Sequence, residues 1–208
     1  MKRIFCIFAL FVLLTNLSVT NGQTRYLKRP VSKFGYGVKG GANLAWQSSP
    51  DNDGSVKINE IIGINAGGYC NYFYTRKLAV QGELLVSTKG SNWKDFYDHM
   101  RDAATYIDLN LLARYQPHKY FSFHLGPVVS YRLNATRKDL GQEVQSEIRD
   151  LYKAAEVSVT AGAELNLPFH INVTLRYIYG LTPATKDDVG SWYNNLVQLS
   201  VGYRIKGR

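Results

Sequence analysis

Cysteine and long apolar runs are both scarce in this chain of 208 residues. Only two cysteines are present, Cys6 and Cys70, and Cys6 lies in a leader-like first stretch. One remaining thiol cannot form an internal disulfide, so small disulfide-held secreted scaffolds are excluded. The mean hydropathy is −0.21, and a bundle of membrane helices would need several runs of about 20 apolar residues each. The sequence therefore excludes a membrane helix bundle as well.

Charge is also low, and no long amphipathic-helix pattern is present. Charged residues make up 20% of the chain and aromatic residues 13%, a composition unlike that of disordered proteins. The 15 tyrosines, nine phenylalanines and 18 glycines favour β-structure over helix. The length suits one domain, so the expectation is a single large β-domain.

The first residues have the organisation of an export signal. A short basic start precedes an apolar run from Ile4 to Leu14, and the small residues Thr20 and Gly22 stand three and one positions before a cut at Gln23. This pattern predicts a secretory signal peptide over residues 1–22. The alternative is a single membrane anchor, for which the apolar run is short.

Alternation of apolar and polar residues recurs in eight segments after the leader. Period-two alternation is the signal of a strand with two different faces. Short turns alternate with long connections along the chain, as in up-and-down outer-membrane barrels. We therefore predict an all-β fold over residues 34–208: an eight-stranded antiparallel up-and-down transmembrane β-barrel with short periplasmic turns and long extracellular loops. Residues 23–33 would form a periplasmic N-terminal segment. The alternating segments are residues 35–46, 61–74, 78–89, 106–115, 121–134, 154–167, 171–181 and 196–205.

The four long connections are expected at residues 47–60, 90–105, 135–153 and 182–195. Within the third, Val144, Ile148, Leu151 and Tyr152 keep helical spacing. That spacing fits a short helix, and the same stretch fits an extension of the flanking strands. Both interpretations stay open at this point.

The polar face of the segments distinguishes a membrane barrel from a soluble ligand carrier. A soluble barrel would present many solvated lysines and glutamates on its outer face. Here the polar face is mostly small, with a minority of charges of both signs, and it predicts a packed lumen in which buried charges find partners. Strand direction is expected to bring Glu83 and Arg114 to comparable depth. The predicted interior charge network comprises Lys39, Glu83, Asp108, Arg114, Arg132, Glu156, Glu164, Arg176 and Arg204.

The apolar face carries aromatic residues near the segment ends, where a barrel meets the two membrane interfaces. Trp46, Tyr131 and Tyr179 lie towards the long-loop end. Two aromatic girdles are therefore expected on the outer wall. The members towards the short-turn end are Tyr36, Tyr72, Tyr74, Tyr115, Phe121, Phe123 and Tyr203.

Four stretches resemble those of Bacteroidota outer-membrane β-barrel proteins grouped with the PorT family. They are Gly37-Val38-Lys39-Gly40-Gly41-Ala42-Asn43-Leu44, Glu83-Leu84-Leu85-Val86-Ser87-Thr88-Lys89-Gly90, Tyr106-Ile107-Asp108-Leu109-Asn110-Leu111-Leu112-Ala113-Arg114-Tyr115 and Val201-Gly202-Tyr203-Arg204. The resemblance spans essentially the whole mature chain and carries no catalytic signature. It implies an outer-membrane barrel, and PorT itself is tied to protein secretion.

Basic residues gather in the N-terminal segment, two short turns and the C-terminus, where no acidic residue accompanies them. This distribution predicts attraction to anionic phospholipid headgroups on the periplasmic leaflet. Docking of an acidic periplasmic protein is the alternative, and nucleic acid is not expected as a partner of an exported barrel. The basic residues are Arg25, Lys28, Arg29, Lys33, Arg76, Lys77, Lys119, Lys206 and Arg208.

A barrel of about eight strands has an interior that side chains can fill. We therefore expect a monomeric, non-enzymatic outer-membrane module that acts through its loops or its periplasmic rim, with lipid and a periplasmic or extracellular protein as partners. A narrow solute channel is the second hypothesis. The third is an enzyme at the loop rim, where Ser91, Asp98 and His99 lie, although no nucleophile motif accompanies them. No histidine pair has metal-ligand spacing, and no metal or cofactor is expected.

Overall fold

The computed structural model describes residues 33–49, 57–94, 99–139, 145–148, 151–186 and 191–207. The expected signal peptide and nearly all of the expected periplasmic segment lie outside these ranges. Long strands dominate the described chain because most segments alternate between apolar and polar residues over ten or more positions. The strands are β1 (Phe34–Ser48), β2 (Lys57–Asn59), β3 (Ile61–Phe73), β4 (Leu78–Lys94), β5 (His99–His118), β6 (Phe121–Asp139), β7 (Gln145–Glu147), β8 (Ala155–Asn166), β9 (Ile171–Gly180) and β10 (Tyr193–Lys206).

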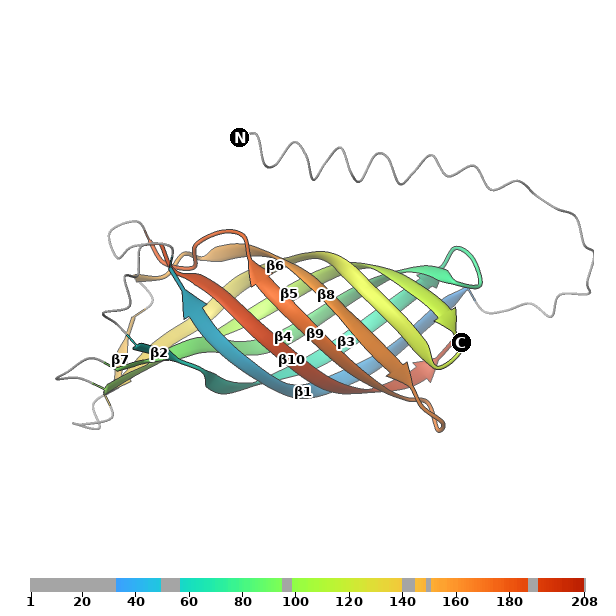
Figure 1. The fold of residues 1–208 in the computed structure, drawn as a ribbon, viewed down its shortest axis with the longest axis horizontal. Coiled ribbons are helices and arrows are strands. Elements are labelled where there is room, and N and C mark those ends of the chain that lie inside the picture. The colour runs from blue at the N-terminus through green and yellow to red at the C-terminus, as the bar shows by residue number, and fades with distance from the viewer. Residues whose placement is uncertain are drawn as a thin grey trace, which may run out of the picture. The chain divides into compact units, whose positions relative to one another are not determined.

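Eight of these strands close into one antiparallel barrel (Figure 1). Around the wall the order is β1, β3, β4, β5, β6, β8, β9 and β10, and β10 pairs with β1 to complete the circle. Every other pairing in this circle joins barrel strands that follow one another along the chain, so the topology is up-and-down. Outside the circle, the short strands β2 and β7 pair with β4 and β6. Closure pairs the backbone of every long strand on both sides, which a structure crossing lipid requires. The predicted fold is confirmed.

Two of the four expected long connections are shorter than predicted because the hairpins continue above the barrel. Strands β4 and β5 stay paired as far as Lys94 and His99, well inside the connection predicted at residues 90–105. In the third connection β6 continues to Asp139, and β7 pairs with it. Among the residues described in that connection, 135–139 and 145–147 extend strands, and Tyr152 forms a bridge with Thr185, which favours the interpretation as a strand extension; Val144 lies outside the described residues.

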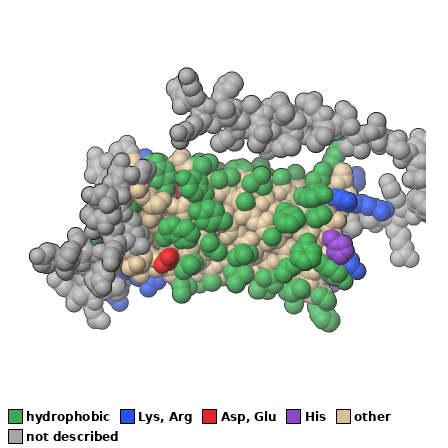
Figure 2. All heavy atoms as spheres, viewed as in Figure 1, with side chains coloured by type: hydrophobic (Ala, Val, Ile, Leu, Met, Phe, Trp, Pro, Cys, Tyr) green, Lys and Arg blue, Asp and Glu red, His purple; other side chains and the backbone are tan. Residues whose placement is uncertain are grey.

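The outer wall is apolar. Along β8, for example, burial alternates almost residue by residue, and the outward positions of all eight strands are leucine, isoleucine, valine, alanine or aromatic in their majority. Figure 2 shows hydrophobic side chains over the wall between the two ends of the barrel. The predicted girdle residues face outward, including Tyr72, Tyr131 and Tyr203, each about half exposed. No helix in the described part of the chain has the length and apolar character of a membrane span.

Candidate functional site

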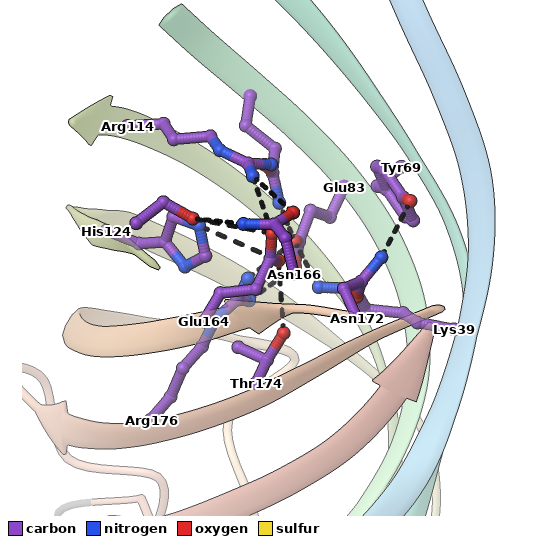
Figure 3. Close-up of polar contacts among 12 residues, drawn as sticks. Lys39, Tyr69, Glu83, Arg114, His124, Glu164, Asn166, Asn172, Thr174 and Arg176 are labelled. Carbon is purple, nitrogen blue, oxygen red and sulfur yellow. Dashed lines mark hydrogen bonds and ion pairs between the residues drawn. The ribbon is translucent and has the colours of Figure 1, made fainter. Parts of the chain in front are cut away.

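The interior of the barrel holds layers of ionic side chains, and the layer nearer the short turns is built on Glu83. This carboxylate lies on β4 and is buried between two cations from other strands, Lys39 on β1 and Arg176 on β9 (Figure 3). Lys39 Nζ lies 2.8 Å from Glu83 Oε1, and Arg176 Nη2 donates to the same oxygen at 2.6 Å. Asn110 donates to the other oxygen at 2.9 Å. Glu83 thus contacts side chains from three other strands, β1, β5 and β9.

A second ion pair lies in the same half of the lumen. Arg114 Nη2 lies 2.6 Å from Glu164 Oε1, and Arg114 also donates to Gln81 and Asn166. The His124 ring is fully buried 3.8 Å from Glu164, and neither of its nitrogens has a hydrogen-bond partner among the described residues. Because cations outnumber acids in this half, burial is supported by amide and hydroxyl groups as well as by ion pairs.

The layer nearer the long loops has the reverse arrangement, with one cation between two acids. Lys89 Nζ lies 3.0 Å from Asp108 Oδ1 and 2.8 Å from Glu156 Oε1, and all three side chains are buried. Ser130 accepts a hydrogen bond from the same ammonium at 2.7 Å. Asn194 donates to the second oxygen of Glu156 at 2.7 Å. The ammonium therefore donates to Ser130 and Glu156 and is in ion-pair contact with Asp108.

An apolar cap lies at the loop end of the lumen, beside a further ion pair. Asp102 and Arg137 form a two-bond pair at 2.7 Å for each bond, and the Tyr152 hydroxyl donates to the same carboxylate at 3.2 Å. Burial, and then the charge of Asp102, raise the pKa of Tyr152, so the hydroxyl keeps its proton,. The cap is a buried apolar cluster of Ala104, Tyr106, Ala135, Ile148, Tyr152 and Ala184, with Leu151 packed against it.

Glycines on the inner face provide space for the long interior side chains. A Cβ on Gly37 would lie 2.6 Å from the hydroxyl oxygen of Tyr69, whose ring crosses the lumen there. A Cβ on Gly162 would lie 2.5 Å from Cγ of Arg176. Any larger residue at these two positions would displace a member of the charge layers or its neighbour.

Seven of the nine residues expected in the interior network lie in these layers: Lys39, Glu83, Asp108, Arg114, Glu156, Glu164 and Arg176. Arg132 and Arg204 do not join them by any ion pair among the described residues. Both residues are partly exposed, although one guanidinium nitrogen of each, Arg132 Nη1 and Arg204 Nε, is buried without a hydrogen-bond partner among the described residues. Arg132 donates instead to the Lys153 carbonyl at 3.2 Å.

The prediction that Glu83 and Arg114 lie at comparable depth in the lumen is wrong. In the paired register Glu83 faces Asn110, and Arg114 faces Ala79, so the two charges are offset by four residues along the strands. Gln81 bridges the offset, because it accepts from Arg114 and donates to Glu83. Matching the middles of two segments cannot reveal the register, which depends on the turn between them.

Sequence reasoning also missed interior residues. Lys89 has the same parity as Gln81 and Glu83, and this parity indicates an inward side chain, but the residue stands at the end of its alternating segment and the predicted network does not include it. Leu85, Leu112 and Val128 face inward with at most 1% exposure. Each follows or precedes another apolar residue, so the sequence does not alternate between apolar and polar residues at these positions. The inner face is therefore less uniformly polar than predicted.

The residues considered for an enzyme do not form a described site. Ser91 faces the lumen, is fully buried and donates to Gln47 at 3.0 Å. Asp98 and the His99 side chain lie outside the described part of the chain. Within the described ranges, no group of three histidine, cysteine, aspartate or glutamate side chains could hold a metal ion.

A closed antiparallel barrel with an apolar wall and an ionic, capped interior defines the class of small outer-membrane barrels. Residues 21–186 match the family model described as an outer membrane protein beta-barrel domain. The chain belongs to that family, and its location is the outer membrane. Membership in the PorT family and a Bacteroidota origin stay predictions.

Solved outer-membrane barrels share the fold. The structure is similar to that of Ail, the attachment invasion locus protein of Yersinia pestis, with 15% sequence identity and a TM-score of 0.50 over 83% of this chain and 99% of Ail. Neisserial surface protein A is also similar, with 14% identity and a TM-score of 0.49 over 84% of this chain and 99% of that one. No curated protein sequence matches the chain.

Proposed function

We propose that the protein is a non-enzymatic membrane module with a closed lumen that acts through its two ends. The observation that carries this proposal is the filled interior. Buried ion pairs occupy both halves of the lumen, and an apolar cluster lies at the end near the loops. The wall itself faces lipid, so the loops and the turn rim are the surfaces left for contact with other molecules.

The main rival is a narrow solute channel, and conductance in planar bilayers separates the two functions. The purified wild-type protein should give no current or only very small currents, because moving ions would have to break the pairs around Glu83 and Lys89. A pore-forming barrel added to the same membrane afterwards shows that the bilayer reports conductance. Stable, large single-channel currents from the wild type would support the channel and reject the closed module.

An association with secretion is supported by the PorT resemblance alone. Crosslinked pulldown from native outer membranes tests it: recovery of secretion components with the wild type, and not with an unrelated small barrel, would favour it. Acylation and proteolysis assays on the same material test the remaining enzyme hypothesis. Activity that survives purification of the barrel would reject the non-enzymatic proposal.

A further inference from the structure

The turn end of the barrel is one continuous rim, in which each chain segment is joined to the next. The segments are the start of β1, the β3–β4 turn, the β5–β6 turn, the β8–β9 turn and the end of β10. The joining backbone hydrogen bonds run from Phe73 N–H to Lys33 O at 2.7 Å, from Gln116 N–H to Lys77 O at 2.7 Å, from Asn166 N–H to Tyr120 O at 2.8 Å and from Arg204 N–H to His170 O at 2.8 Å.

Exposed lysine or arginine side chains lie at four of the five rim segments, all but the β8–β9 turn, and so are not confined to one sector. Lys33 stands at β1, Arg76 and Lys77 at the next turn, Lys119 at the following turn and Lys206 at the end of β10. Residues 33–34, 74–78, 116–121, 167–171 and 204–207 include no acidic residue. Figure 2 shows lysine, arginine and histidine side chains together at this end of the visible face.

Aromatic side chains project from the same rim. Tyr74 is 82% exposed and Phe169 is 86% exposed, and the Lys119 ammonium lies 4.7 Å from the centre of the Tyr120 ring. Phe169 and His170 have φ values of 60° and 65°, a strained left-handed conformation for such residues. The β8–β9 turn thus holds a large apolar ring outward, where bulk water would be an unfavourable surrounding.

We propose that this rim binds the phosphate groups of anionic phospholipids in the periplasmic leaflet around the barrel. The distribution of charge carries the inference. A protein docking to the rim would need a concentrated patch in one sector, whereas a leaflet meets every strand of the wall at the same height. Cations near an anionic leaflet are attracted to it, and aromatic rings are enriched at the level of the headgroups.

The test uses the full-length protein in nanodiscs of equal parts phosphatidylcholine and phosphatidylglycerol, with the retained lipids counted by native mass spectrometry. The wild type should retain phosphatidylglycerol in preference to phosphatidylcholine. Lys77→Gln, Lys119→Gln and Lys206→Gln should each lower that preference, by up to about fivefold, and the triple variant should lose most of it. The matched control is Lys138→Gln, an exposed lysine at the loop end, which should retain the preference.

Folding of each variant is checked by its heat-dependent mobility on gels, and the single variants decide the matter if the triple variant does not fold. Equal retention of the two lipids by the wild type would overturn the proposal. So would a loss confined to one of the three lysines, since that result indicates a single local lipid site and not binding around the whole rim.

Discussion

The two halves of the lumen both bury charged side chains around one central residue, but the central residue has the opposite charge in each half. Towards the short turns, one acid, Glu83, lies between the cations Lys39 and Arg176. Towards the long loops, one cation, Lys89, lies between the acids Asp108 and Glu156. Each central residue therefore holds apart two like charges that would otherwise repel one another in a poorly solvated interior.

The difference matters because acids and bases respond differently to the loss of a partner. A carboxylate left without its cation can take up a proton and become neutral, and aspartate and glutamate do so at moderately low pH. An arginine cannot lose its proton under any ordinary condition. Substitution of the central residue should therefore lower folding stability more in the half built on Glu83 than in the half built on Lys89.

The largest effect is expected from Glu83→Gln. This change keeps the shape of the side chain but leaves Lys39 and Arg176 buried without their acid, and stability should fall by about 3–5 kcal/mol. Urea unfolding followed by tryptophan fluorescence measures the loss. The matched control is Lys77→Gln in an exposed turn, which should change stability by less than about 0.5 kcal/mol. Equal losses of stability in the two variants would contradict a central role of Glu83 in the lumen.

A smaller loss, about 2–3 kcal/mol at neutral pH, is expected from Lys89→Met. Asp108 and Glu156 keep hydrogen bonds from Ser87 and Asn194 in its absence. The same urea titration measures the loss, and Lys77→Gln again serves as the control. A loss equal to that of Glu83→Gln, or larger, would contradict the predicted difference between the two halves of the lumen.

The pair between Asp102 and Arg137 should contribute less than either buried layer. The Arg137 side chain is 32% exposed, and water weakens the attraction of such pairs. We expect Arg137→Gln to cost about 1 kcal/mol, measured by the same urea titration. A loss as large as that of Glu83→Gln would show that the loop end, and not the lumen, dominates stability.

Sequence alternation was sufficient for the strands, their closure and the side on which most charges lie. For Lys39 and Glu164, parity alone assigns the inner face, because one residue out of phase with an apolar run must point inward. It could not predict which charges pair. Arg176 contacts Glu83 across the lumen from a strand that is not its neighbour, and such a contact depends on barrel diameter and strand stagger. The hairpin extensions were missed because both of their faces are polar or mixed there.

The smallest effect concerns the outer wall. Cys70 is exposed on the lipid-facing side of β3, where a thiol has no access to water when the barrel is in its membrane. A membrane-impermeant maleimide should leave it unlabelled in intact cells and label it after denaturation. A matched cysteine variant, Lys119→Cys, should label once the periplasm is opened. Rapid labelling of Cys70 in intact cells would show that β3 is turned the other way.

A double-mutant cycle between Glu83 and Arg176 tests the central claim most directly. The variants are Glu83→Gln, Arg176→Met and the two together, each unfolded in urea beside the wild type. If the two residues form a buried pair that supports the filled lumen, their coupling energy should be about 2 kcal/mol or more. A coupling below about 0.5 kcal/mol, with the single losses simply adding, would contradict the account.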